Sequence, residues 1–89
     1  MKHATSETLQ SLLPLLEQLR KLPGLTERKP GIFYRKSVPF LHFHEDPQGI
    51  FADVKLDGRN FTRIDVFHPV GQVRLMVAVT RALQPAPSR

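Results

Sequence analysis

Two histidines and several acids stand close together in the middle of the sequence, in the segment FLHFHEDPQGIFADVK at residues 40–55. His42 and His44 are two residues apart, which puts their side chains on the same face of a β-strand. The segment DPQG that follows is typical of a hairpin turn. A hairpin closed at residues 46–49 places Asp53 opposite His42, so two imidazoles and one carboxylate share a face.

These residues predict a divalent metal site formed by His42, His44 and Asp53. Two histidines and one carboxylate suit zinc, iron or manganese and leave positions open for water, as in a small metal-dependent enzyme. The alternative is a structural role, in which a cross-strand row of His42, Asp53 and Arg63 only stabilises the sheet.

The sequence gives less support to other kinds of catalytic site, such as a magnesium nuclease or a serine hydrolase. Asp53-x-Lys55 with Asp46 upstream matches part of a magnesium nuclease pattern, but Asp46 falls in a turn and no Pro-Asp pair is present. No glycine-rich phosphate loop or serine elbow is found. The absence of cysteine excludes thiolate metal sites and a cysteine nucleophile.

The elements that position these residues begin with a helix over residues 5–22. Thr5 or Ser6 can cap its start, and Pro14 predicts either a kink near Ser11 or two short helices, the second capped by Ser11. The segment TERKPG at residues 26–31 is interpreted as a polar connector. The apolar stripe of the helix consists of leucines spaced at i, i+3, i+4 and i+7, namely Leu9, Leu12, Leu13, Leu16 and Leu19.

After this connector the apolar period changes from 3.6 to 2. Four short runs rich in phenylalanine, isoleucine and valine predict an antiparallel meander: GIFYRK, PFLHFHE, GIFADVKL and NFTRIDVF. Residues 70–83 favour a helix, with a fifth strand as the alternative. The expected fold is α+β, of order α-β-β-β-β-α, with the N- and C-terminal helices packed on one face of a four-stranded antiparallel sheet. Residues 1–83 form one domain, and 84–89 a disordered tail.

Hairpin registers divide the sheet into two faces. The apolar face, with Leu41, Phe43, Ile50, Ala52, Val54 and Leu56, must be the core under the helices. A three-residue loop centred on Gly58 aligns Asp53 with Arg63, because other registers bury charge. The outer face, as we call the opposite side, then carries the histidines and Asp53 together with Phe40, Phe51, Lys55, Phe61, Arg63 and Asp65. Three aromatic rings in one patch predict an interaction surface and a homodimer through it.

Basic residues are concentrated between residues 20 and 36, where six lysines and arginines face one glutamate. We expect Arg28, Lys29, Arg35 and Lys36 to bind polyanions weakly, either nucleic acid or an acidic protein.

The composition fits one small soluble domain of 89 residues with a formal net charge of +5. No apolar run is long enough for a membrane span and no secretory signal is evident, so a cytoplasmic protein without a membrane partner is expected.

The runs KPGIFYRKSVPFLHFHED and FADVK resemble a small bacterial family of uncharacterised proteins that shares the FLHFHED and FADV runs. More loosely, the order of a Pro-Gly pair, a phenylalanine-rich strand and His-x-His-x-Asp resembles the so-called luciferase-domain proteins. The resemblance covers about residues 22–66, draws attention to His42, His44 and Asp46, and implies a bacterial source.

The sequence therefore favours a non-enzymatic binding or interaction domain that uses the open sheet face. The alternatives are a small metal-dependent enzyme built on His42, His44 and Asp53, or a weak nucleic-acid binder using the basic segment.

Overall fold

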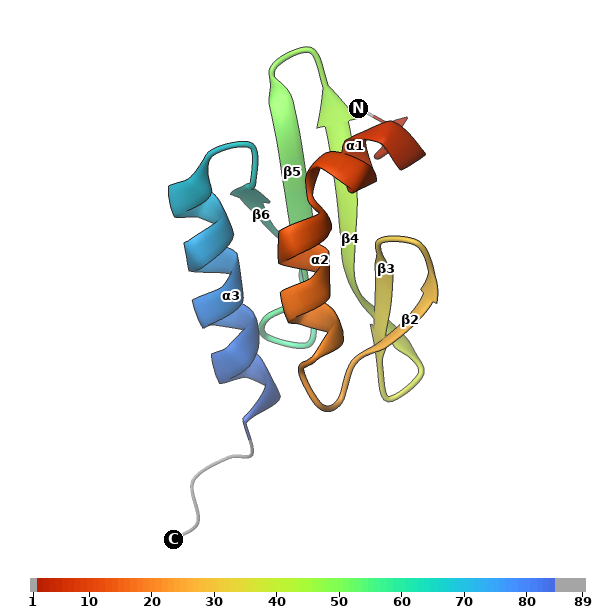
Figure 1. Ribbon diagram of the computed structural model, residues 1–89. Coiled ribbons are helices and arrows are strands. Elements are labelled where there is room, and N and C mark those ends of the chain that lie inside the picture. Colours follow the sequence, from red (N-terminus) through yellow and green to blue (C-terminus); the bar gives the residue numbers. More distant parts are fainter. Residues whose placement is uncertain (1, 85–89) are drawn as a thin grey trace, which may run out of the picture.

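The computed structural model describes residues 2–84 and shows an α+β fold with an antiparallel sheet (Figure 1). The sheet has six strands in the order β2-β3-β4-β5-β6, and β1 pairs with β4 off this path. The predicted tail lies almost wholly outside the described residues. The elements in chain order are β1 (Lys2–His3), α1 (Ser6–Ser11), α2 (Leu13–Arg20), β2 (Thr26–Lys29), β3 (Ile32–Arg35), β4 (Val38–Asp46), β5 (Gly49–Val54), β6 (Thr62–Asp65) and α3 (Pro69–Leu83).

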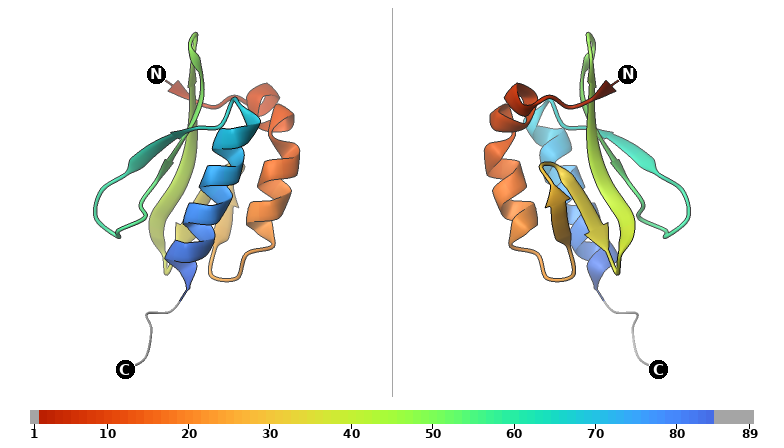
Figure 2. Two further views of the ribbon diagram at one scale, coloured as in Figure 1. Left: turned by 90° about the vertical axis from the view of Figure 1, so that its left-hand side faces the viewer. Right: turned by 90° about the vertical axis from the view of Figure 1, so that its right-hand side faces the viewer.

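The helices lie on one side of β4, β5 and β6 and leave the other side of these strands open (Figure 2). The buried residues between helices and sheet are almost all aliphatic or phenylalanine, as a core of this size requires. They are Leu12, Leu15, Leu16, Leu19, Phe33, Phe40, Leu41, Phe43, Ala52, Val54, Val66, Leu75 and Val79.

The predicted registers of the central strands are confirmed. His42 pairs with Asp53 and His44 with Phe51 across β4 and β5. Asp53 pairs with Arg63 across β5 and β6, as the loop centred on Gly58 requires. The core and outer faces of these strands therefore follow the period-2 pattern of the sequence.

The interruption by Pro14 is also confirmed, because α1 and α2 are separate helices. Thr5 caps α1 by accepting a hydrogen bond from the backbone N–H of Thr8. The expected cap of the second helix by Ser11 is wrong: the Ser11 hydroxyl donates to the Thr8 carbonyl, and Leu12 occupies the cap position.

Two strands were not expected from the sequence. The supposed polar connector forms β2, which pairs with β3 through a turn where Gly31 has φ 76°, a value that suits glycine. Thr26, Arg28 and Lys29 on β2 are exposed, as charged residues on an edge strand commonly are. The second unexpected strand, β1, has only two residues. The four-strand, two-helix prediction was therefore close but incomplete.

Phe40 departs from the predicted alternation. It is only 3% exposed and belongs to the core, although strict alternation places it on the outer face. The register between β3 and β4 shifts at this point, because Phe33 pairs with Leu41 and Tyr34 with Pro39. Phe40 is thus the extra residue of a β-bulge, which re-aims its side chain.

The last element, α3, is a helix, so the alternative of a fifth strand at residues 70–83 is wrong. Its first turn packs closely on the end of β6, where a Cβ at Gly71 would lie 1.6 Å from the Asp65 carbonyl oxygen. Within residues 2–84 no helix is long and apolar enough to cross a membrane.

Candidate metal centre

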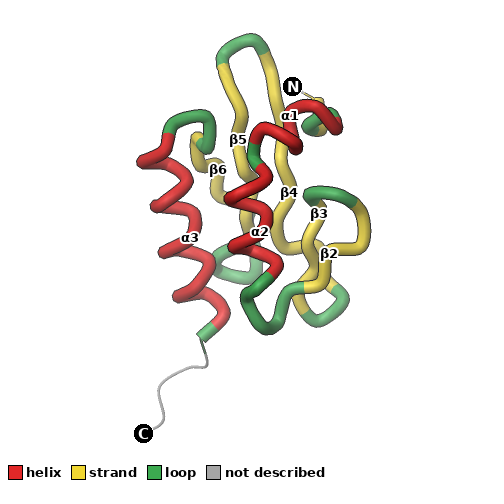
Figure 3. The backbone as a smooth tube through the Cα atoms, viewed as in Figure 1, coloured by secondary structure: helices red, strands yellow, loops and turns green. Residues whose placement is uncertain are grey.

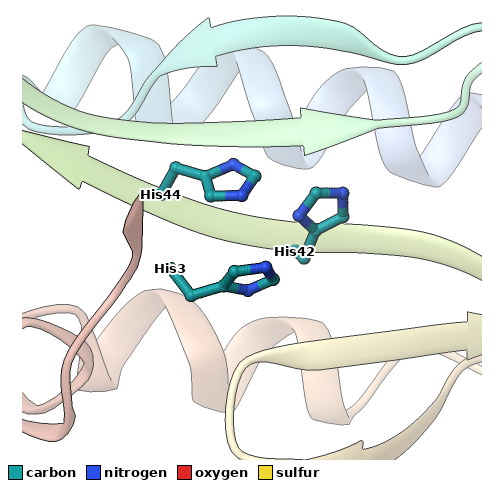
Figure 4. A group of neighbouring side chains, drawn as sticks. All are labelled: His3, His42 and His44. Carbon is teal, nitrogen blue, oxygen red and sulfur yellow. The ribbon is translucent and has the colours of Figure 1, made fainter. Parts of the chain in front are cut away.

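Three histidines converge on the outer face: His3 from β1, and His42 and His44 from β4 (Figure 4). One ring nitrogen from each lies within 4.8 Å of those from the other two. The ring centres of His42 and His44 are 4.6 Å apart, and those of His3 and His44 are 4.7 Å apart. Neutral imidazole is a common ligand of zinc, copper, iron and nickel, so this cluster has the chemistry of a metal site.

The position of His3 follows from the pairing of β1 with β4. His3 is the register partner of His44, and directly opposed residues of antiparallel strands share a face. The Ala4 backbone N–H donates to the Phe43 carbonyl at 3.0 Å, which continues this pairing by one residue. A short strand from the start of the chain therefore completes the cluster.

The Glu45 carboxylate anchors the segment that follows β1. It accepts hydrogen bonds from the Thr5 backbone N–H at 2.6 Å and from the Thr8 hydroxyl at 2.7 Å. These donors hold the pKa of Glu45 below its usual range. The start of α1 is thereby tied to the same strand that carries His42 and His44.

Asp53 lies between the histidine cluster and Arg63. Its Oδ2 is 2.6 Å from His44 Nδ1, and the Arg63 guanidinium donates to both of its oxygens at 2.9 and 3.0 Å. Burial acts to raise the pKa of Asp53, but the hydrogen bonds from Arg63 and His44 outweigh it and lower that pKa. An ionised carboxylate only accepts, so the short contact places a proton on His44 Nδ1. The other ring nitrogen of a neutral His44, Nε2, is then free to bind a metal.

His42 is held in the form that binds metals. Burial lowers its pKa, the neighbouring His44 lowers it further, and Asp53 acts in the opposite direction. The lowered pKa favours the neutral imidazole, which is the form that binds a metal. Its Nδ1 is buried and has no hydrogen-bond partner among the described residues, which is costly for a polar atom.

The predicted metal residues are thus brought together, but in different roles. His42 and His44 lie side by side, and Asp53 contacts His44 and Arg63. Sequence reasoning missed His3, which lies far from the His-x-His pair along the chain. A strand of two residues is too short to show a period, so no local pattern could have identified it.

The rest of the predicted interaction face is less apolar than expected. Phe40 is buried in the core, Phe51 is half-buried, and only Phe61 is largely exposed, at 43%. Arg63 is committed to Asp53, and Asp65 accepts from the Phe67 backbone N–H and contacts His68. The homodimer through this face stays a prediction.

The predicted polyanion-binding residues fall into two groups. Arg28 stacks on Tyr34, and Lys29 lies at the β2–β3 turn. Arg35 and Lys36 instead lie at the β3–β4 turn and line a hollow together with Lys55.

A scan of protein-family models finds no match, and searches of curated proteins and of solved structures find no significant similarity.

Proposed function

We propose that this chain is a metal-binding domain that holds one divalent transition-metal ion, zinc in the first instance, through His3, His42 and His44. The observation that carries the proposal is the convergence of three imidazoles, one ligating nitrogen from each lying within 4.8 Å of the others. The supporting residue is Asp53, because a carboxylate that orients a metal-binding histidine is a common outer contact of such sites.

The cluster is close to the geometry of a bound ion. Zinc–nitrogen bonds of 2.0–2.1 Å in a tetrahedral site bring ligating nitrogens to about 3.3 Å from one another. The three nitrogens lie within 4.8 Å, so the longest separation must shorten by at most about 1.5 Å. The exposed His3 on a two-residue strand is the ligand that can move most readily. Ligation through His42 Nδ1 would also satisfy a buried nitrogen that has no other partner within residues 2–84.

Three protein ligands leave a fourth position for water or another molecule. A water bound there would be acidified by the ion, so a small hydrolytic enzyme is the second candidate function. The observation that favours it over a closed structural site is the position of the cluster on the face that the helices leave open (Figure 2). In that case the metal residues are His3, His42 and His44, with Asp53 positioning His44 instead of serving as the third ligand.

The test is calorimetric titration of the metal-free protein with zinc at pH 7.4, combined with thermal melting. Because an oligohistidine tag also binds zinc, the protein must be purified without one. We expect one ion per chain and, at a free zinc concentration of 100 Kd, about 2.7 kcal/mol of added stability. Replacing His3, His42 or His44 by alanine should each weaken zinc binding at least tenfold.

His68 provides the matched control. It is the fourth histidine of the chain, is exposed, and contacts Asp65 instead of the cluster. His68→Ala should bind zinc as the wild type does. Zinc that leaves the melting temperature unchanged, or equal binding by His3→Ala and the wild type, would contradict the proposed site. Affinity should fall steeply below about pH 6, because the ligating imidazoles must be neutral.

A further inference from the structure

A hollow of about 340 Å³ is lined by residues of the β3–β4 turn and of the β5–β6 loop. Both connections lie toward the same end of the sheet (Figure 3). Arg35 and Lys36 line it from the turn, and Lys55 lines it from the end of β5. Val38 and Phe40 supply apolar surface. None of the described residues that line the hollow is acidic, and three of them are basic. The Arg35 guanidinium donates to the Ala82 carbonyl at 2.7 Å, so Lys36 and Lys55 are the cations left to meet an anion.

The nearby acids are engaged elsewhere. Asp57, two residues after Lys55, accepts hydrogen bonds from the backbone N–H groups of Arg59 and Asn60 at 2.7 and 2.8 Å. On the outer face, Asp53 is bound by Arg63 and His44, as described above. Arg63 therefore compensates the charge of Asp53, whereas Asp57 keeps its negative charge and is held by the backbone N–H groups of its own turn.

The β3–β4 turn holds Lys36 in an unusual backbone conformation. Lys36 and Ser37 have φ values of 51° and 66°, in the left-handed region that glycine and asparagine normally occupy in two-residue hairpin turns. Neither residue eases this conformation, and such outliers gather at functional sites. The Ser37 hydroxyl also accepts a long hydrogen bond from Arg28, which brings a fourth cation beside the turn.

An exposed aromatic ring adjoins the hollow. Lys55 Nζ lies 4.9 Å from the centre of the Phe61 ring, and the His42 ring lies 4.9 Å from it as well. Phe61 is 43% exposed. A cationic hollow beside an open aromatic ring combines the two features with which proteins bind single-stranded nucleic acid, namely phosphate contacts and base stacking.

We propose that this hollow binds the phosphate groups of a single-stranded polynucleotide, with Lys36 and Lys55 contacting phosphates and Phe61 stacking on a base. The proposal goes beyond metal binding and does not depend on it. It also assigns binding to only part of the basic segment. Lys29 lies at the end of β2 that is remote from the hollow, so we expect it not to contact the polynucleotide.

The experiment measures binding of a fluorescently labelled oligothymidylate to metal-free protein by anisotropy, across a series of salt concentrations with a chelator present. The test variant is the double substitution Lys36→Gln and Lys55→Gln. The matched control is Lys21→Gln with Lys29→Gln, which removes the same charge from exposed positions outside the hollow. A third variant, Phe61→Leu, removes the ring and keeps the charge.

The test variant should bind more weakly, and the slope of log affinity against log salt should become shallower by about 1.4, which is about 0.7 for each lost phosphate contact. Phe61→Leu should weaken oligothymidylate binding at least fivefold without changing the salt slope.

Melting curves will establish that each variant is folded. Equal loss in the control and test variants would overturn the proposal in favour of diffuse charge. Absence of binding by the wild type at low salt would also overturn it. If Phe61→Leu bound oligothymidylate with unchanged affinity, the proposal that the hollow binds a polynucleotide through base stacking would be wrong, and the hollow would be an unspecific anion site.

Discussion

Replacing Asp53 by asparagine tests whether this carboxylate orients the metal site or merely supports the sheet. Asparagine keeps the size of the side chain but removes its charge. Its NH2 group is itself a donor, so it cannot accept the hydrogen bond from His44 or Arg63 that a carboxylate oxygen accepts. Asp53 is bonded to His44 Nδ1 at 2.6 Å and to Arg63 at 2.9 and 3.0 Å. The substitution therefore breaks at least one short, charge-assisted hydrogen bond in a buried position.

The expected loss of stability follows from the exposure of the two partners. A hydrogen bond to a charged group contributes about 1.5–3 kcal/mol, and His44, only 15% exposed, cannot replace it with water. The Arg63 side chain is 50% exposed and can be hydrated when its partner is lost, so it contributes little to the loss of stability. We expect Asp53→Asn to cost about 2–3 kcal/mol, which in a domain of this size corresponds to a melting temperature about 8–24 °C lower.

The two roles separate when zinc affinity is measured alongside thermal melting. If Asp53 orients His44, Asp53→Asn should weaken zinc binding about 10–100-fold, and it should have no further effect in a His44→Ala background. Asp65→Asn makes the same chemical change at an exposed position and should leave zinc affinity unaltered. Normal zinc affinity in a destabilised Asp53→Asn protein would show that the residue is structural only. An unchanged melting temperature would refute the hydrogen-bond argument itself.

Four further substitutions test other parts of the fold. Gly71→Ala should lower the melting temperature strongly, because a Cβ there would lie 1.6 Å from a backbone oxygen of β6 and α3 would have to move. Phe40→Ala should cost about 3–5 kcal/mol in denaturant unfolding as a core residue, whereas Phe61→Ala should cost much less. Glu27 pairs with Arg20, whose hydrogen bond outweighs burial and lowers the pKa of Glu27. The stability that the ionised Glu27 contributes is present above the pKa of the unfolded state and is lost as the pH falls. Glu27→Gln should therefore destabilise the protein by about 1 kcal/mol at pH 7 and by progressively less below about pH 4.

The central strands were predictable because two independent constraints agree on them. Alternation of apolar residues fixes the core face, and the turn sequences around Pro47 and Gly58 set the lengths of the connections. A slip of one residue would have buried Arg63, which is far costlier than any gain in the turn. The pairing of His42, Asp53 and Arg63 is therefore predictable from the sequence alone.

The predictions that failed concern residues whose structure is fixed neither by apolar alternation nor by a turn sequence. β2 is polar on both faces, so its strand conformation depends on the hairpin with β3 and not on burial. Phe40 sits at a bulge, where the period of two is broken by a single residue. His3 belongs to a strand of two residues whose position is set by hydrogen bonds to β4. In each case pairing with another strand determines the outcome: β2 and Phe40 depend on the neighbouring strand β3, and His3 depends on the distant strand β4.

The two proposed sites share one ring, and this predicts that their ligands interact. Phe61 lies 4.9 Å from both Lys55 Nζ and the His42 ring, so Lys55 Nζ and the centre of the His42 ring are at most about 10 Å apart. We take roughly 10 Å as the separation between a phosphate at Lys55 and an ion at the histidines. A divalent ion and a singly charged phosphate at that separation attract by about 0.8 kcal/mol in water. Zinc should therefore tighten oligothymidylate binding about fourfold at roughly 10 mM salt, where screening is weak.

The coupling must be reciprocal, so oligothymidylate should raise the affinity for zinc by the same factor. It should largely vanish above roughly 0.3 M salt, because the screening length then falls well below the separation of the charges. His42→Ala should abolish the coupling, since it removes the ion, while leaving the binding of oligothymidylate in chelator nearly intact. Zinc that left oligothymidylate affinity unchanged at low salt would show that the two sites, if both are occupied, lie too far apart to act on each other.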